Sequence, residues 1–188
     1  AILLVIVIVG AATYREYQKS QAEMEAELFG TSIIDALTEK NAADRILKFQ
    51  KINAPEENAR AILAMLLSAE ANANGSATLE MSSLSEITQS LSIDAHYRDL
   101  LNFKILLGSA EIMDLDKRII AFEALSKPGN PFRLLAEEQI ALIELELGNT
   151  DDAIEKISQI LLDSELTTGL RNRVTQMMIA LGKDPELI

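Results

Sequence analysis

The sequence predicts an all-α fold built from antiparallel helical hairpins. Ala, Leu, Ile and Glu dominate the 188 residues, whereas there are four Pro and the aromatic share is 4%. This composition favours helix over strand. Apolar residues recur at helical spacing, and no alternation of useful length indicates a strand. The length suits one domain or a short array of repeats.

The acidic charge balance and the absence of cysteine exclude several kinds of chemistry. The formal net charge is −12 and the pI is about 4.5, which argues against non-specific nucleic-acid binding through phosphate neutralisation. Such a surface also favours solubility and repels anionic membrane surfaces. With no cysteine, disulfides, thiolate zinc sites and cysteine nucleophiles are excluded.

Residues 1–12 form an uncharged apolar run, AILLVIVIVGAA. Twelve helical residues rise about 18 Å, whereas a bilayer core needs about 30 Å. Three interpretations are open: the second half of a transmembrane helix, the tail of a secretory signal peptide cleaved near Gly10-Ala11-Ala12, or a buried core segment.

The residues after this run favour a retained anchor. Tyr14 and Tyr17 stand where interfacial aromatics are enriched, and Arg15 and Lys19 can extend their charges towards water. We therefore expect residues 1–13 to be the C-terminal part of a transmembrane anchor and residues 14–188 to be a helical domain. The few cations in this flank favour its location outside the cytoplasm.

Turn signals divide the rest of the chain into helices. The first stripe of apolar residues predicts a helix over residues 26–39, with Phe29, Ile33, Ile34 and Leu37 facing inward. A loop is expected at 74–83, and a second one at 127–131, where two prolines and a glycine occur. Further helices are predicted over residues 43–52, 55–73, 95–112, 116–125 and 168–181, with two more within 132–162 and a weaker one near 84–91. Asp94 is expected to cap the helix at 95–112, and Gly182 is expected to end the last one.

The segment 136–162 contains two helical patterns that meet at Gly148-Asn149-Thr150-Asp151. Gly148 suits a left-handed C-cap, because glycine adopts that conformation without a Cβ penalty. Thr150 or Asp151 is then expected to cap the next helix. Two short amphipathic helices joined this tightly must lie antiparallel.

This hairpin resembles a tetratricopeptide repeat. Ala141 stands where that family has Gly or Ala, Gly148-Asn149 replaces the usual Gly-Asp turn, and Ala153 is the small residue early in the second helix. Three departures are Glu137, Glu144 and Glu165, at positions that favour Trp, Tyr and Pro.

The spacing of the hairpins fits the same interpretation. The turn near Met113-Asp114 lies 34 or 35 residues before Gly148, which is the period of tetratricopeptide repeats. The predicted architecture is therefore a tetratricopeptide-repeat-like stack of four hairpins, over residues 29–52, 59–91, 97–125 and 132–162. The helix at 170–181 caps the stack.

A closer resemblance is carried by the apolar start together with NPFRLLAEEQIALIELELGNTDDA and LRNRVTQMMIALG. The chain is similar to the bacterial tetratricopeptide repeat-like membrane-anchored family that includes the ancillary subunit of the Sec translocon. The resemblance implies a single-pass inner-membrane protein with its repeats in the periplasm. It also implies association with the protein-conducting channel and with periplasmic chaperones, and it offers no catalytic motif.

Polar clusters in the sequence are better explained by structure than by chemistry. His96, the single histidine, lacks the further ligands that a metal site requires. Four glutamates lie on the first helix of this hairpin. Glu137 faces Glu144 and Glu138 faces Glu146, as expected for a solvated face. We expect no enzyme activity, no cofactor and no metal site.

The expected functional surface is a groove lined by the first helices of successive hairpins. An apolar groove with acidic edges suits an extended or helical apolar segment of a partner protein. The alternative is that the same leucines pack inside the core. The candidate groove residues are Leu100, Phe103, Leu107, Leu135, Glu138, Leu142 and Leu145.

The sequence thus predicts a non-catalytic, membrane-anchored adaptor that binds translocon subunits, periplasmic chaperones or exported chains. An envelope-assembly scaffold of the same architecture, unconnected to protein export, is the alternative. Neither role involves nucleic acid or a small-molecule substrate.

Overall fold

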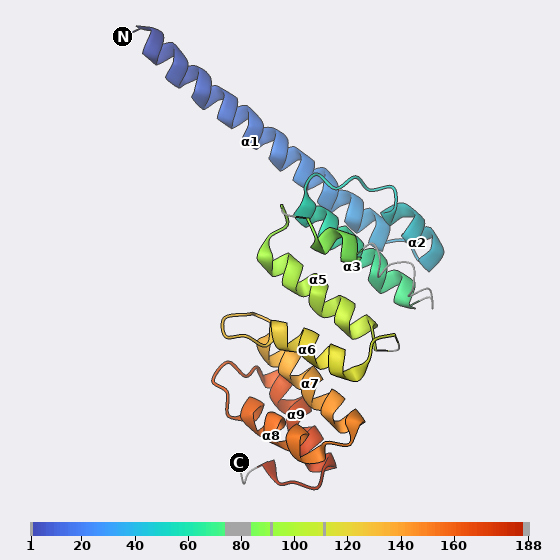
Figure 1. Cartoon of the computed structure of the whole chain (residues 1–188). Helices are drawn as coiled ribbons and strands as arrows, with labels where there is room; N and C mark the ends of the chain where they lie inside the picture. Colours follow the sequence, from blue (N-terminus) through green and yellow to red (C-terminus); the bar gives the residue numbers. More distant parts are fainter. Residues whose placement is uncertain (1, 74–83, 91, 111, 186–188) are drawn as a thin grey trace. The chain divides into compact units, whose positions relative to one another are not determined.

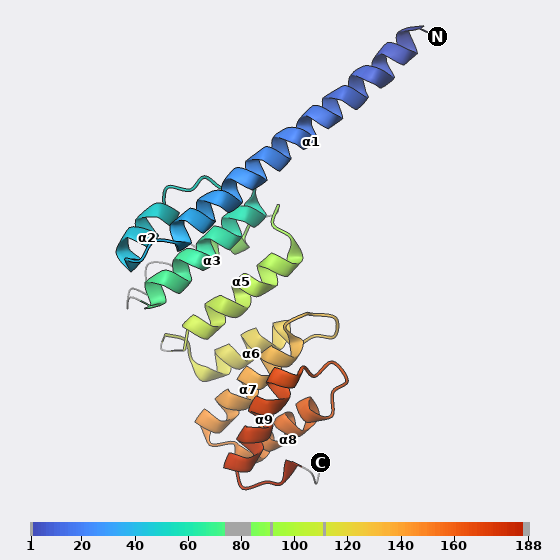
Figure 2. The ribbon, with the colours of Figure 1, turned by 180° about the vertical axis from the view of Figure 1, so that it is seen from behind.

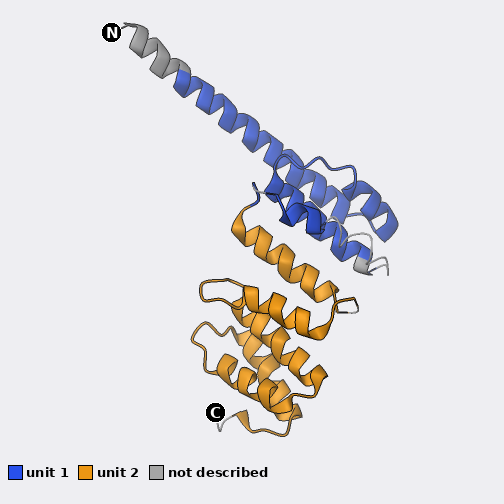
Figure 3. Ribbon diagram, in the orientation of Figure 1, with its two compact units in different colours: residues 1–93 blue, residues 94–188 orange. Residues whose placement is uncertain are grey.

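The computed structural model describes residues 2–73, 84–90, 92–110 and 112–185 (Figure 1). All regular elements in these ranges are helices, so the predicted all-α class is confirmed. The chain divides into two compact units, residues 1–93 and 94–188 (Figure 3). The expected loop at 74–83 lies outside the described residues.

Helix α1 spans Ile2–Leu37 without interruption. Its 36 residues correspond to a length of about 54 Å. The apolar run and the first predicted helix are therefore one element, and the expected boundary between residues 13 and 14 falls inside it. Across the described residues, no helix combines the length and the apolar character that crossing a membrane requires.

The C-terminal part of α1 packs against α2 (Ala42–Phe49) and α3 (Glu57–Ala73) to form the core of unit 1. Ala36, Phe49 and Leu63 are buried there, with Phe29 and Ile33 against them. The predicted stripe was partly wrong, because Ile34 and Leu37 are exposed. Residues 29, 33 and 36 follow the i, i+4, i+7 spacing of one helix face, and the short side chain of Ala36 completes it.

Polar contacts fix the tight turn between α1 and α2. Asn41 caps α2, since its Oδ1 accepts hydrogen bonds from the backbone N–H groups of Ala43 at 2.8 Å and Asp44 at 3.3 Å. Arg45 donates to the backbone oxygen of Glu39 at 2.8 Å and forms a 2.6 Å ion pair with Glu70 of α3. One guanidinium on α2 thus binds both the turn that follows α1 and helix α3.

Unit 2 begins with α5 (Ala95–Gly108) and α6 (Leu115–Leu125), as Figures 1 and 2 show. The sequence extended the first of these helices to residue 112, but it ends four residues earlier. Buried Ser109 ends it, because its Oγ donates to the backbone oxygen of Leu106 at 2.8 Å. Its own carbonyl then accepts the N–H groups of Ile112 and Met113.

The remaining helices are α7 (Arg133–Leu147), α8 (Thr150–Leu161) and α9 (Thr168–Ala180). Helix α7 contacts both α6 and α8, and α9 contacts α8. One core cluster joins α7 to α5 and α6 through Phe103, Phe122 and Ile140. A second cluster joins α7 to α8 and α9 through Ala141, Ile157 and Val174.

The turn between α7 and α8 follows the predicted left-handed geometry. Gly148 has a φ of 84°, and the N–H groups of Gly148 and Asn149 bond to the carbonyls of Leu145 and Glu144. The predicted N-cap was wrong: Asn149 precedes α8 and makes no capping bond. Its side-chain amide instead donates to Glu144 at 2.8 Å.

The Gly148→Ala variant is expected to destabilise unit 2 by about 1–2 kcal/mol, because a Cβ disfavours left-handed backbone. Gly169→Ala is the matched control: Gly169 lies in the first turn of α9, its φ is not positive, and no atom lies within 4 Å of an added Cβ. That change should stabilise slightly, by up to about 1 kcal/mol. Urea denaturation measures both, and equal effects would contradict the assigned cap.

Candidate partner-binding surfaces

The predicted groove residues of unit 2 differ in exposure. Leu107 on α5 and Leu142 on α7 are exposed, the latter by 41%. Leu100, Leu135 and Leu145 are half-buried, and Leu135 packs against both core clusters. Leu107 and Leu142 are therefore the groove candidates that present most apolar surface to a partner.

Phe103 differs from the groove expectation because it belongs to the core. Its ring lies edge-on to Phe122 and stacked against Phe132, with 5.8 Å between ring centroids in both pairs. Such pairs contribute roughly 0.5–1.5 kcal/mol beyond the burial of their area. The ring therefore connects α5 to α6 and to the start of α7.

Glu138, the expected acidic edge of the groove, is 5% exposed and forms an ion pair. Arg173 of α9 donates Nε and Nη2 to its two carboxylate oxygens, each at 2.7 Å. The hydrogen bonds to Glu138 raise the pKa of Arg173 above its ordinary value. Sequence analysis missed the pair, although the 35-residue separation of the two residues is close to one repeat period.

A second charged cluster joins the start of α7 to the loop between α8 and α9. Arg133 Nη2 lies 2.8 Å from Asp163 and 2.8 Å from Glu165, and its Nη1 lies 3.4 Å from Glu137. The backbone N–H of Glu165, followed by the guanidinium of Arg133, lowers the pKa of Asp163. Two of the three departures from the repeat pattern, Glu137 and Glu165, thus have a partner in Arg133.

A small hollow of about 330 Å³ lies beside this cluster. Arg133 and Glu165 line it together with Leu135 and Leu170. The Arg133 guanidinium is already neutralised by its carboxylates, so the hollow offers an incoming ligand little unpaired charge. Its apolar lining belongs to the contact between α7 and α9.

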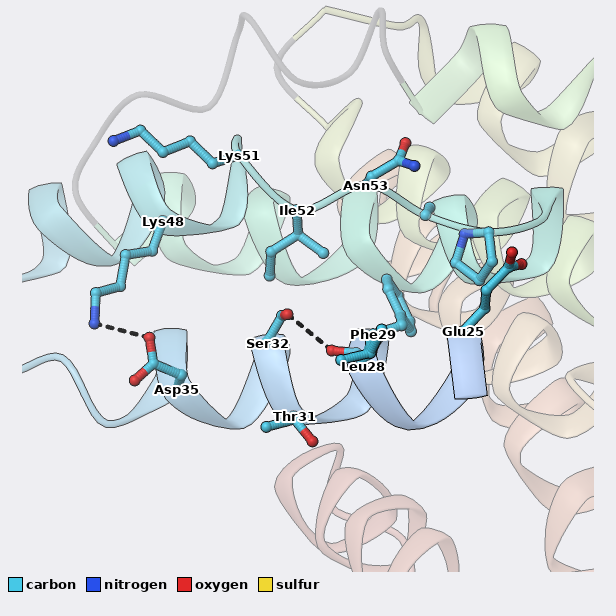
Figure 4. Close-up of a pocket in the computed structure, with 12 residues that line it drawn as sticks. Glu25, Leu28, Phe29, Thr31, Ser32, Asp35, Lys48, Lys51, Ile52 and Asn53 are labelled. Carbon is cyan, nitrogen blue, oxygen red and sulfur yellow. Dashed lines mark hydrogen bonds and ion pairs between the residues drawn. The ribbon is translucent and has the colours of Figure 1, made fainter. Parts of the chain in front are cut away.

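Unit 1 contains a larger groove that the sequence did not predict. Its volume is about 890 Å³, and it runs between α1 and residues 48–55 (Figure 4). Leu28, Phe29 and Ile52 contribute apolar surface, and Lys48 and Asp35 face each other across it at 3.1 Å. Its walls come from segments about twenty residues apart in the sequence, so no local sequence pattern predicts the groove.

The structure places the single histidine at the surface. His96 is exposed near the start of α5. Within the described ranges, no group of three or more His, Asp or Glu side chains is placed to hold a metal ion.

Comparisons with protein-family models, curated proteins and solved structures found no match to this chain.

Replacing Arg173 by Gln is expected to destabilise unit 2 by about 1–2 kcal/mol, because the buried Glu138 carboxylate loses two charged hydrogen bonds. The figure is modest because 52% of the Arg173 side chain is exposed. Arg171→Gln on the same helix is the control and should have little effect. A Glu138→Gln/Arg173→Gln double variant should recover part of the loss. Equal urea midpoints for the two single variants would contradict this account.

Replacing Asp163 by Asn is expected to make the melting temperature fall less steeply as the pH is lowered into the acidic range. The pKa of Asp163 in the folded state lies below its ordinary value of about 3.8. Its stabilisation is therefore present above that value and is lost as the pH falls through the folded-state pKa. Melting temperatures between about pH 7 and pH 2 measure the effect. Glu123→Gln, at an exposed position on α6, is the control, and parallel curves for Asp163→Asn and the unmodified chain would refute the assignment.

Proposed function

We propose that this chain is a non-catalytic, membrane-anchored helical-repeat adaptor that binds other proteins during export. The observation that carries the proposal is the succession of α6, α7, α8 and α9, each packed on the one before it. An extended stack of this kind builds surfaces for other chains, because each hairpin leaves one face of its helices uncovered.

Two features of this stack support a tetratricopeptide-repeat-like arrangement. Helices α6 and α8 begin at Leu115 and Thr150, which are 35 residues apart, close to the repeat period. Ala141 and Ala153 are fully buried on α7 and α8, where small side chains let two helix backbones approach each other. The arrangement departs from a strict repeat at the first helices, since α5 and α7 begin 38 residues apart, at Ala95 and Arg133.

Exposed leucines on the first helices of the two hairpins support a role in binding. Leu107 and Leu142 remain at the surface, although the same helices bury Leu101, Phe103 and Leu106 on α5 and Leu134, Ile140 and Ile143 on α7. An apolar segment of an exported or membrane-bound protein suits such a surface better than a charged peptide does. The acidic net charge of −12 disfavours polyanionic partners.

The membrane anchor and the periplasmic location rest on the sequence. The apolar residues 1–12 continue into a helix whose residues 11–20 are exposed, which suits a helix that leaves a bilayer before it reaches the folded part. Association with the Sec translocon and with periplasmic chaperones rests on the family resemblance of residues 130–181.

Topology in cells tests the proposal. A reporter that is active only after export, fused behind Ile188, is expected to be active, and the fusion is expected to remain with the membrane fraction. The same fusion carrying Val5→Lys and Ile8→Lys is the control. Each lysine costs about 2.5–3.5 kcal/mol of insertion at a helix centre, so this fusion should leave the membrane fraction. A cytoplasmic reporter on the unmodified chain would overturn the periplasmic role.

A photo-crosslinking residue at Leu142 in the same fusion separates the two candidate roles. Capture of a channel subunit supports the export role, whereas capture of an envelope-assembly protein supports the scaffold alternative. Leu162 is a suitable control position, because it is exposed but lies outside the predicted groove. Equal capture from both positions would contradict binding at the groove.

A further inference from the structure

Four large apolar side chains lie in a row along the exposed side of α1. Tyr14, Tyr17, Met24 and Leu28 are each 52% to 63% exposed, and Gln21 stands in the middle of the row. Between successive members the sequence advances by three, four, three and four residues. This alternation is the a and d pattern of a heptad repeat.

The row lies on a different face of α1 from the one that builds unit 1. The side chains of Phe29, Ile33 and Ala36 point into the core. At 100° per residue, the row is turned from them by roughly a quarter of the helix circumference. It therefore remains available while α1 is packed against α2 and α3. Leu28 ends it at the mouth of the groove in Figure 4.

The spacing indicates what covers this row. A straight helix has 3.6 residues per turn, so a strict repeat of 3.5 drifts around its surface unless two helices supercoil about each other. A globular partner with a flat or irregular surface does not require that period. A second helix that supercoils with α1 must have the same period, and another copy of α1 has that period because its sequence is identical.

The repeat also continues upstream in the sequence. Leu3, Val7 and Gly10 extend the same alternation, so that the positions run from 3 to 28. This is close to the three or four heptads that a coiled coil needs. Downstream, the next positions are Thr31 and Asp35, which are polar, and there α1 begins to pack within its own unit. The row therefore ends where the intramolecular core starts.

Charge at the flanking positions is compatible with two identical helices running parallel. In that arrangement each g residue faces the e residue five positions later on the other copy. The resulting pairs are Thr13 with Gln18, Ser20 with Glu25, and Glu27 with Ser32. None of them brings two like charges together, although α1 carries several glutamates.

We propose that two copies of this chain pair through α1 as a parallel, in-register coiled coil over residues 14–28, whose heptad register the sequence continues up to residue 3. Gln21 occupies a central a position, where a polar side chain meets its own copy and sets the register at some loss of stability. The inference goes beyond the adaptor role and does not depend on the identity of its partner.

The absence of cysteine in the chain allows a direct test. Single variants Tyr14→Cys, Gln21→Cys and Leu28→Cys, all at a positions, are oxidised with copper phenanthroline in the full chain, in detergent with micelles in excess. Each should form a disulfide-linked dimer at least tenfold faster than Lys19→Cys. Lys19 occupies the outward f position, where its exposed side chain pairs with Glu23 of its own helix at 3.7 Å.

The pattern of crosslinks decides between the possible outcomes. Crosslinking at all three a positions supports the parallel pair, whereas crosslinking at one of them alone overturns it in favour of an antiparallel contact. Equal rates for all four variants indicate random collision and also overturn it. Independently, Met24→Glu should weaken dimerisation at least tenfold in sedimentation equilibrium, while Lys19→Glu should not. A monomeric unmodified chain would reject the proposal and leave the adaptor role untouched.

Discussion

Helix α7 has to bury two of its faces at once, and the packing of unit 2 depends on this requirement. Ile140 and Ile143 fill the cluster shared with α5 and α6, whereas Leu134 and Ala141 fill the cluster shared with α8 and α9. A helix buried on two sides needs small residues at its closest contact, because backbones cannot approach across two large side chains. Ala141, fully buried in the cluster that α7 shares with α8 and α9, meets that need.

The ion pairs in the first half of this helix are related to the same burial. With two faces covered, the Glu138 carboxylate of α7 has little access to water and needs a partner within the protein. Glu138 finds Arg173 on α9, and Arg133 finds Asp163 and Glu165 in the loop before α9. Both contacts tie α7 to the segment after α8, so α9 is held by charge as well as by its apolar contact with α8.

Local pattern was sufficient to predict the helices and the hairpin turn, because each depends on residues within a few turns of one another. Gly148 and the end of α9 before Gly182 were predicted on conformational grounds and are confirmed. The end of α5 was missed, because buried Ser109 acts through a hydrogen bond that periodicity does not reveal. Likewise Ala36 was overlooked in favour of Ile34, since hydrophobicity alone ranks the larger side chain higher.

The candidate surfaces were less predictable for a related reason. Phe103 and Glu138 stand at positions that point outward in a repeat of ideal geometry, yet Phe103 stacks on Phe132 and Glu138 binds Arg173. The groove of unit 1 needs α1 and residues 48–55 to be brought together by the fold. Contacts between segments distant in sequence decide these cases, and one sequence carries few signals for them.

The exposed tyrosines of α1 have a spectroscopic consequence. The chain has three tyrosines and no tryptophan. Two of the three, Tyr14 and Tyr17, are exposed on α1. Two thirds of the tyrosines that can emit therefore lie on that helix. The tyrosine emission of this protein reports mainly on what α1 touches, while far-ultraviolet circular dichroism follows the helices of both units together.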